Sequence, residues 1–256
     1  MANAFIVILF AMLGASLGSF LNVVALRSVS GRPWGGSERS ACPDCGAMLE
    51  CRDLIPLFSW CFLRGRCRRC GAKISVRYFA VEIIGALASG LLAWRWGLSA
   101  ALPFAMVAAF GLFLNALTDI EDGYVFDVFP LAMGVTGALL RIQGGAGALL
   151  DGTLGAAAGF ALIGCIILLS RGGMGWGDAT LAAGVGVILG WRMLLLTLYT
   201  GFMIGGVITV LLMLAGKVRR KDAVPLVPFL AIGGLVTLLV GPRLLLSFGS
   251  APGWPW

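Results

Sequence analysis

The chain has 256 residues, of which 59% are hydrophobic and only 12% are charged, and its mean hydropathy is +0.97. Soluble domains carry about a quarter charged residues, so this composition excludes an ordinary soluble domain and indicates a protein that lies in a lipid bilayer. The sequence contains no histidine. This excludes Ser-His-Asp and Cys-His triads and a catalytic zinc ion held by histidine.

The apolar segments predict an all-α integral membrane protein with about eight transmembrane helices, since each span needs about 20 residues. In chain order the expected helices are Ala4–Leu26, Tyr78–Trp94, Leu98–Thr118, Tyr124–Leu140, Leu149–Ser170, Asp178–Leu189, Met193–Gly216 and Val224–Leu246. No basic residue precedes the first segment, so we expect a retained helix rather than a cleaved signal peptide. The chain then divides into a first helix (1–26), a polar cysteine-rich loop (27–77) and a transmembrane bundle (78–256).

The basic residues predict the orientation of these helices. If the N-terminus lies outside, the inner segments hold 15 of the 19 basic residues. The outer segments hold the other four: Arg95, Arg141, Arg192 and Arg243. Segments rich in Lys and Arg face the cytoplasm, so the cysteine-rich loop is expected on the cytoplasmic side. The net charge of +7 therefore reflects topology, and we expect no nucleic-acid partner.

Six of the seven cysteines lie in the polar loop, and four of them form two C-x-x-C-G motifs. These four are Cys42, Cys45, Cys67 and Cys70. Two such pairs are typical of a tetrahedral zinc site with four thiolate ligands. Disulfides are the alternative, but a cytoplasmic loop is kept reduced. We therefore expect a structural zinc ion, which leaves no open position for a catalytic water.

Two of the 12 acidic residues, Asp119 and Asp178, are expected at the cytoplasmic edge of the membrane. Carboxylates near hydrocarbon are costly and tend to be functional, and a pair that shares one proton can hydrolyse a peptide bond. Helix capping is the alternative for either residue alone. The segment from Arg171 to Asp178, which includes Gly175 and Gly177, is richer in glycine than a cap requires. Asp127 follows and could orient a partner or line a polar cavity.

Several motifs together resemble the bacterial type 4 prepilin peptidases, which are bifunctional leader peptidases and N-methyltransferases. The similar segments are Gly18-Ser-Phe-Leu-Asn-Val-Val24 with Arg27, Asp53-Leu-Ile-Pro-Leu-Phe-Ser-Trp60 leading into Arg64–Cys70, Ile74–Tyr78 with Val81-Glu82, and Gly175-Trp-Gly-Asp178. The resemblance runs from the first to the sixth expected helix, about three quarters of the chain. The sequence departs from the family pattern in three ways: Thr180 replaces a usual Lys, Val125-Phe126 replace Leu-Pro, and Glu121 stands where Asp is commoner.

The resemblance implies an aspartyl intramembrane protease of the bacterial inner membrane, with Asp119 and Asp178 as its catalytic pair. It implies cleavage of prepilins or pseudopilins after a Gly, and methylation of the new N-terminal residue from S-adenosylmethionine. We expect methyl transfer at the aqueous loop 27–77, with Glu82 just inside the following helix as a supporting residue. A pair with Arg77 at the helix end is the alternative for Glu82.

Other classes of protein fit the sequence less well. A transporter could use carboxylates in the membrane for ions, but it should contain two similar halves with broken helices, which the sequence does not indicate. A catalytically silent platform for pilin assembly would not need both aspartates. An archaeal preflagellin peptidase is disfavoured by the cysteine-rich loop.

Overall fold

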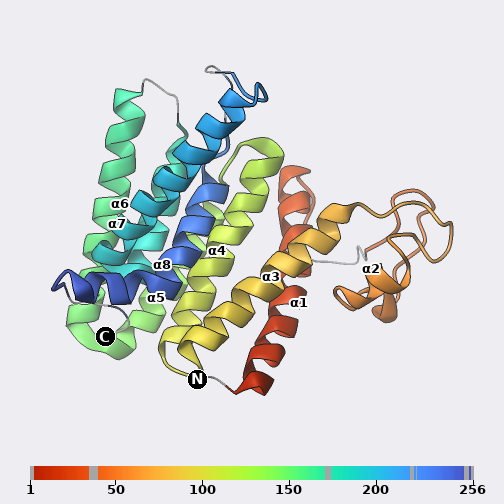
Figure 1. Cartoon of the computed structure of the whole chain (residues 1–256), viewed down its shortest axis with the longest axis horizontal. Helices are drawn as coiled ribbons and strands as arrows, with labels where there is room; N and C mark the ends of the chain where they lie inside the picture. Colours follow the sequence, from red (N-terminus) through yellow and green to blue (C-terminus); the bar gives the residue numbers. More distant parts are fainter. Residues whose placement is uncertain are drawn as a thin grey trace. The chain divides into compact units, whose positions relative to one another are not determined.

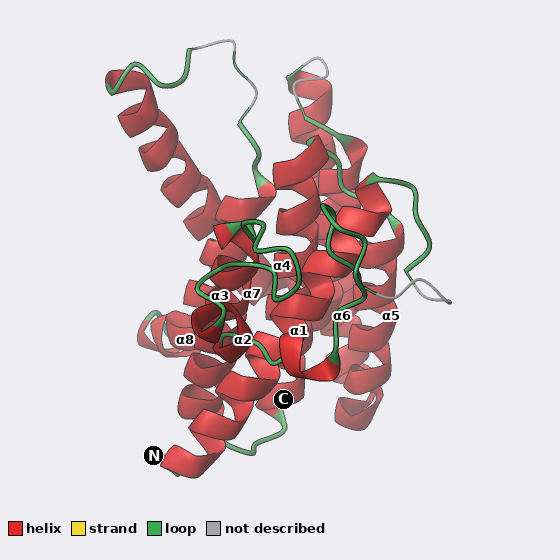
Figure 2. Cartoon of the chain, turned by 90° about the vertical axis from the view of Figure 1, so that its right-hand side faces the viewer, coloured by secondary structure: helices red, strands yellow, loops and turns green. Residues whose placement is uncertain are grey.

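The computed structural model describes residues 3–34, 40–170, 174–219, 222, 224–250 and 254. Their secondary structure is helical (Figures 1 and 2), apart from two isolated β-bridges, Ala41 with Met48 and Arg66 with Lys73. The prediction of an all-α protein is therefore confirmed. The chain forms two compact units, Met1–Gly97 and Leu98–Trp256, and each is described by itself.

The first unit is built on two long helices that pack against each other. Its elements are α1 (Ala4–Val29), the short η1 (Cys51–Asp53), α2 (Phe58–Phe62) and α3 (Val76–Trp96). A Cβ atom on Gly14 would collide with the carbonyl oxygen of Gly85, and one on Gly85 would collide with that of Gly14. The hydroxyl of Ser89 in α3 also donates to the carbonyl of Phe10 in α1, at 2.7 Å. Small residues thus let the two backbones touch, as in other membrane helix pairs.

The second unit is a bundle around α4. Its elements are α4 (Ala101–Asp122), α5 (Val128–Arg141), the short η2 (Ile142–Gly144), α6 (Gly145–Leu169), α7 (Trp176–Leu214) and α8 (Val227–Ser247). α7 packs against α5, α6 and α8, and α4 packs against α5 and α8. About 67% of the apolar window of α4 is buried, against 39% or less for every other candidate span. The helix that carries Asp119 is therefore the central one of this unit.

Six helical stretches of the described residues are long and apolar enough to cross a membrane. Two of them are much longer than one span. Val128–Leu169 contains both α5 and α6, and Trp176–Leu214 contains a non-helical residue, Gly190, with φ 77° and ψ 167°. The expected division of α7 between Leu189 and Met193 coincides with this break. The number of eight spans stays a prediction.

A buried arginine satisfies the backbone at the break in α7. The Arg141 side chain is fully buried, although the charge pattern had placed Arg141 among the outer loop residues. Its guanidinium donates to the carbonyl of Ile188 at 3.2 Å and to that of Ala148 at 2.5 Å, and it pairs with Asp151 at 3.1 Å. Because Gly190 interrupts the helix, carbonyls before it need partners from elsewhere. Arg141 supplies one of those partners.

We predict that Gly190→Ala lowers the free energy of unfolding by at least about 2 kcal/mol, because only glycine tolerates this backbone conformation. A Cβ atom there would also collide with the Asp151 carboxylate. Gly206→Ala is the matched control, since Gly206 lies in the same helix with no atom near its added Cβ. Thermal unfolding in detergent should separate the two variants, and equal melting temperatures would contradict the role given to Gly190.

Candidate active site and metal centre

Asp119 lies in the last turn of α4, because the helix continues four residues beyond the expected end at Thr118. Gly123 then ends the helix with a left-handed backbone (φ 64°), and its N–H donates to the carbonyl of Asp119 at 2.9 Å. This is a common way for a helix to stop. The Asp119 residue is only 8% exposed, so its carboxylate depends on partners within the protein.

One such partner comes from α8, 108 positions later in the chain. The backbone N–H of Val227, the first residue of α8, donates to Oδ2 of Asp119 at 2.9 Å, and the N–H of Leu226 also reaches this carboxylate. α8 has no side-chain cap at its own N-cap position, which Leu226 occupies. This contact was not predicted from the sequence. The absence of Ser, Thr, Asp or Asn at the start of α8 was the signal that its N–H groups needed an acceptor from elsewhere.

Asp178 is the third residue of α7 and lies within electrostatic range of Asp119. Its Oδ2 accepts the N–H of Gly175 at 3.3 Å, and its carboxyl group is close enough to that of Asp119 for a direct electrostatic interaction. The structure therefore brings together the two aspartates that the sequence singled out. Both the end of α4 and the start of α7 contribute to this meeting point.

The two glycines of the Gly-Trp-Gly-Asp motif differ in what surrounds them. A Cβ atom on Gly177 would lie 2.8 Å from the Cβ and from the carbonyl oxygen of Val125. A Cβ atom on Gly175 would meet nothing closer than 3.9 Å. Gly177 is thus required where the start of α7 touches the segment between α4 and α5, whereas Gly175 has room for a side chain. Residues 171–173 of the glycine-rich segment lie outside the described residues.

Asp127 binds the start of α7. The hydroxyl of Thr180 donates to Oδ1 of Asp127 at 2.7 Å and lies 2.9 Å from the carbonyl of Gly177. Asp127 thus forms a hydrogen bond to this helix, and its role in orienting a partner stays a prediction. The donor, Thr180, is one of the departures from the family pattern.

The second candidate centre is the cysteine cluster of the first unit. The Sγ atoms of Cys42, Cys45, Cys67 and Cys70 all lie within 4.8 Å of one another, and those of Cys42 and Cys70 are 3.9 Å apart. Four thiolates around a zinc ion with bonds of about 2.3 Å lie about 3.8 Å from one another. The cluster therefore fits a tetrahedral metal ion. Cys51 and Cys61 are exposed and are not part of the cluster.

The two halves of the cluster have the same backbone. In the first, the N–H of Cys42 donates to Ala47 and that of Gly46 donates to Cys42, both at 2.9 Å. In the second, the N–H groups of Cys67 and Gly71 make the equivalent bonds to Ala72 and Cys67, at 2.8 and 3.0 Å. Both glycines have positive φ, 67° and 73°. Each C-x-x-C-G motif is thus a tight turn that directs two sulfur atoms to one point.

Backbone donors, rather than arginines, favour a thiolate here. The N–H groups of Cys70 and Arg69 lower the pKa of the Cys67 thiol to about 7, whereas the neighbouring Cys45 thiol helps to raise the pKa of Cys70 to about 12. Arg68 pairs instead with Asp53 at 2.7 Å, and this hydrogen bond holds the pKa of the Asp53 carboxyl below its usual range. Arg69 pairs with Glu50 at 3.4 Å. These ion pairs join the second cysteine turn to η1.

Glu82 holds the loop between η1 and α2 against α3. Its residue is buried, and its two carboxylate oxygens accept the hydroxyl of Ser19 at 2.8 Å and the N–H of Leu57 at 2.7 Å. Leu57 has an unusual positive φ of 66°, in a tight turn closed by the N–H of Phe58 and the carbonyl of Pro56 at 2.7 Å. Arg77 donates to Asn22 at 3.1 Å. Glu82 thus lies in the first unit and belongs to a different set of contacts from the aspartate pair.

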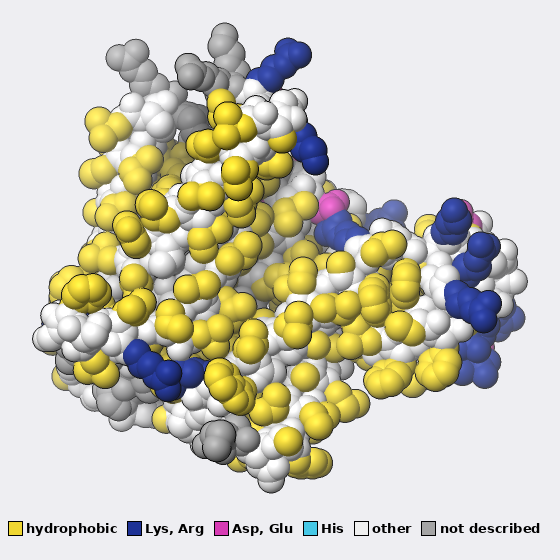
Figure 3. Space-filling view, in the orientation of Figure 1, with side chains coloured by type: hydrophobic (Ala, Val, Ile, Leu, Met, Phe, Trp, Pro, Cys, Tyr) yellow, Lys and Arg dark blue, Asp and Glu magenta, His cyan; other side chains and the backbone are white. Residues whose placement is uncertain are grey.

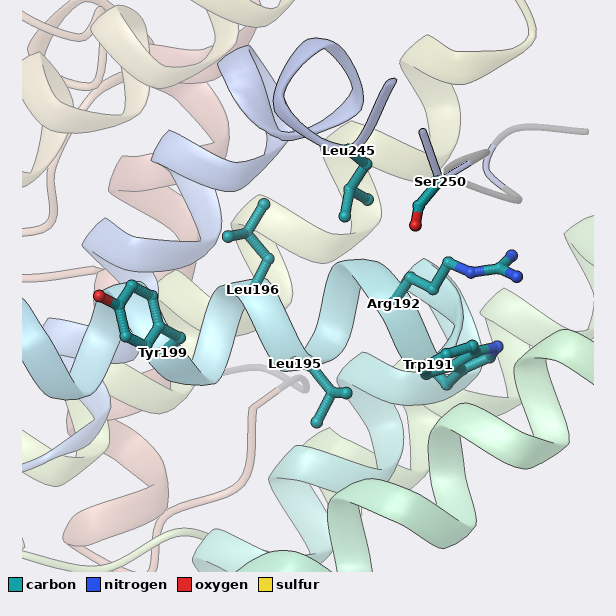
Figure 4. Close-up of a pocket in the computed structure, with 7 residues that line it drawn as sticks. All are labelled: Trp191, Arg192, Leu195, Leu196, Tyr199, Leu245 and Ser250. Carbon is teal, nitrogen blue, oxygen red and sulfur yellow. The ribbon is translucent and has the colours of Figure 1, made fainter. Parts of the chain in front are cut away.

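A shallow pocket of the second unit contains none of the predicted site residues (Figure 4). It is lined by Trp191, Arg192, Leu195, Leu196, Tyr199, Leu245 and Ser250. Leu245 lies 18 residues after Val227 in α8, which corresponds to about 27 Å along the helix. The pocket is therefore at the opposite end of α8 from the aspartate pair.

Comparisons with known proteins agree with this arrangement. Residues 12–96 match the family model described as the Bacterial Peptidase A24 N-terminal domain, and residues 106–210 match the Type IV leader peptidase family. The first match contains the cysteine cluster and Glu82, and the second contains both aspartates. No solved structure matches.

Curated relatives named prepilin leader peptidase/N-methyltransferase match most of the chain. The protein from Burkholderia pseudomallei (strain 1026b) is 34% identical over 93% of this chain and 86% of its own length. That from Aeromonas hydrophila is 36% identical over 79% and 72%, and that from Bacillus subtilis (strain 168) is 31% identical over 82% and 84%. With both family models and relatives of this identity spanning its two units, the chain belongs to the type IV leader peptidase family.

Proposed function

We propose that this multi-pass inner-membrane protein is an aspartyl peptidase that removes the leader from prepilins or pseudopilins and methylates the new N-terminus. The observation that carries the proposal is the meeting of Asp119 and Asp178 in the segment that matches the Type IV leader peptidase family. The names of the curated relatives support both activities.

The aspartate pair can perform hydrolysis by sharing one proton. The ionised carboxylate takes a proton from water as the water attacks the scissile carbonyl, and the protonated carboxyl group donates to the carbonyl oxygen or the leaving amine. Val227 fixes one oxygen of Asp119, and Gly175 fixes one oxygen of Asp178. These backbone donors hold the two carboxyl groups in place for the water and the substrate.

The neighbouring contacts position this pair. Gly177 lets the start of α7 approach Val125, and Thr180 binds Asp127 from the same helix turn. Both contacts fasten the helix that carries Asp178 to the segment that follows Asp119. We therefore assign Gly177 and Asp127 to positioning, and Gly175 to the turn before α7.

We further propose that this site faces the cytoplasm. The end of α4 and the starts of α7 and α8 come together around Asp119. The basic residues Lys217 and Arg219 lie ten and eight residues before Val227, which contacts Asp119. Positive loops remain on the cytoplasmic side of a membrane. A short basic leader that has not crossed the membrane would reach the pair from this side.

We expect Asp119→Asn and Asp178→Asn each to reduce leader cleavage by at least about a thousand-fold, because each removes one partner of the acid–base pair. Asp122→Asn is the matched control, since Asp122 is an exposed residue of the same helix end. Cleavage of a purified prepilin can be followed by mass spectrometry. Methylation of an already cleaved pilin should persist in all three variants, which would show that they fold, and wild-type cleavage by either active-site variant would disprove the mechanism.

We expect Val227→Pro to lower kcat for cleavage by about 10- to 100-fold, because misplacement of one catalytic oxygen is costly. Proline fits the first position of a helix. It removes the N–H that donates to Asp119, and it also disfavours the helical backbone of Leu226 before it (φ −86°, ψ −39°). Val227→Ala is the control: it keeps this N–H and should cleave at the wild-type rate. A loss in kcat with little change in KM supports positioning of Asp119, whereas equal rates for the two variants would contradict it.

The cysteine cluster is proposed to hold a structural zinc ion through Cys42, Cys45, Cys67 and Cys70. The spacing of their sulfur atoms fits this ion, and four thiolates leave no position for a catalytic water. The cysteine module, residues 40–75, contains little regular structure besides η1 and α2. A metal ion would therefore supply much of its folding energy.

Elemental analysis should find about one zinc ion per chain, and the double variant Cys67→Ser with Cys70→Ser should lose it. Cys51→Ser with Cys61→Ser is the matched control and should retain the metal, since neither residue joins the cluster. Chelation should make the cysteine module more sensitive to protease without acting as an inhibitor that competes at the aspartate pair. Full zinc content in the first double variant would rule out this ligand set.

The methyltransferase activity is proposed for the first unit. We keep the division into a first helix (1–26), a zinc-binding loop (27–77) and a peptidase bundle (78–256), with methyl transfer at the loop. S-adenosylmethionine would supply the methyl group. Glu82 is buried, and each of its oxygens accepts a hydrogen bond from the protein, one from Ser19 and one from Leu57. We therefore assign it to holding the loop.

A further inference from the structure

The cysteine module carries exposed apolar side chains on and beside α2. Leu54, Ile55 and Phe58 are 51%, 49% and 54% exposed, and Phe62 is 83% exposed. We call these four residues the apolar ridge. A loop that lay free in water would gain by burying such side chains, so the ridge calls for an apolar surrounding.

Contacts with α3 fix the depth of the ridge relative to the membrane-spanning helices. The N–H of Leu57 is bound by Glu82, which lies six residues, or about 9 Å, past the start of α3. The ring of Trp60 stacks on Phe79, with centroids 4.6 Å apart. The same carboxylate binds Ser19, ten residues before the end of α1. The segment 57–60 therefore lies alongside the ends of two spans rather than beyond them.

The backbone of this segment is suited to an apolar surrounding. Besides the bond from Leu57 to Glu82, the N–H of Ser59 donates to Ile55 at 3.0 Å and that of Cys61 donates to Leu57 at 3.1 Å. The N–H of Phe58 is satisfied within the tight turn. Backbone polar groups near hydrocarbon must find partners within the protein. These groups have such partners, and Glu82 supplies the one that the strained turn at Leu57 could not supply itself.

Charge around the ridge indicates what kind of apolar surface it meets. Residues 40–75 contain six basic and three acidic side chains, and exposed Arg52 and Arg64 flank the ridge on either side. Figure 3 shows basic side chains gathered over this end of the first unit, next to hydrophobic ones. Basic residues beside an apolar face are typical of segments that bind an anionic membrane surface.

We propose that the apolar ridge is an interfacial membrane anchor, which inserts at the boundary between headgroups and acyl chains of the leaflet on the side of the cysteine module. The apolar ridge contacts the acyl chains of lipids, and the flanking arginines contact anionic headgroups. Glu82 and Trp60 hold the ridge at the depth where this is possible. The proposal is independent of the two activities proposed above.

Photo-crosslinking can test the anchor with the full-length protein in nanodiscs of phosphatidylethanolamine and phosphatidylglycerol. Phe62→p-benzoylphenylalanine keeps an aromatic side chain on the ridge. Met48→p-benzoylphenylalanine is the matched control, because Met48 is 64% exposed but lies at the first cysteine turn. After irradiation, mass spectrometry should find lipid adducts at position 62 at least about five-fold more often than at position 48.

Equal lipid adducts at both positions, or none at position 62, would overturn the proposal. An adduct to a supplied prepilin that replaces the lipid adduct would assign the ridge to substrate binding, and a covalent dimer would assign it to a second copy of the chain. Hydrogen exchange provides a second measurement. The double variant Phe58→Ser with Phe62→Ser should speed exchange of the amides of residues 54–62 by about ten-fold with zinc content unchanged, whereas unchanged exchange would contradict anchoring.

Discussion

The second unit depends on the hydrogen bond between the N–H of Val227 and the carboxylate of Asp119. A buried carboxylate needs donors from the protein, and the first N–H groups of a helix need acceptors. Here the Asp119 carboxylate and the first N–H of α8 satisfy each other, so the start of α8 and the end of α4 are held together. Asp178 then joins from α7, where Gly177 and Val125 bring the backbones into contact. Three helix ends that are far apart in sequence thereby form one site.

Helix backbones can approach this closely only where the residues that face each other are small. Gly14 and Gly85 in the first unit, and Gly155 and Gly186 in the second, face each other where no Cβ atom would fit. Helices in lipid associate through such contacts, since lipid chains are as apolar as the side chains that face them. These glycines therefore hold the scaffold, whereas Gly177 brings the start of the helix that carries Asp178 against Val125.

The features that could be predicted from the sequence were those that depend on local spacing or on composition. The apolar segments, the cysteine spacing and the scarcity of carboxylates identified the helices, the four clustered cysteines and the aspartates that meet. The contacts of Val227 with Asp119, of Ile188 with Arg141 and of Leu57 with Glu82 were missed. In each of them one partner is a backbone group, which has no side-chain signature, and the separations of 108, 47 and 25 positions exceed any local pattern. The end of α4 at Asp122 and the start of α8 at Val227 were missed, because the left-handed Gly123 decides the first and the carboxylate of Asp119 caps the second.

These three missed contacts follow one rule and lead to different roles. In each, a charged side chain satisfies a backbone group where regular structure starts, breaks or turns: Asp119 at the start of α8, Arg141 at the break in α7 and Glu82 at the turn before α2. Burial and unusual partners therefore do not by themselves mark a catalytic residue. Arg141 forms an ion pair with Asp151, and Glu82 accepts hydrogen bonds from Ser19 and Leu57 within its own unit. Asp119 alone of the three lies beside a second carboxylate. A like charge beside a buried carboxylate weakens the fold unless the two share a proton, and this cost distinguishes the reactive site from the two structural ones.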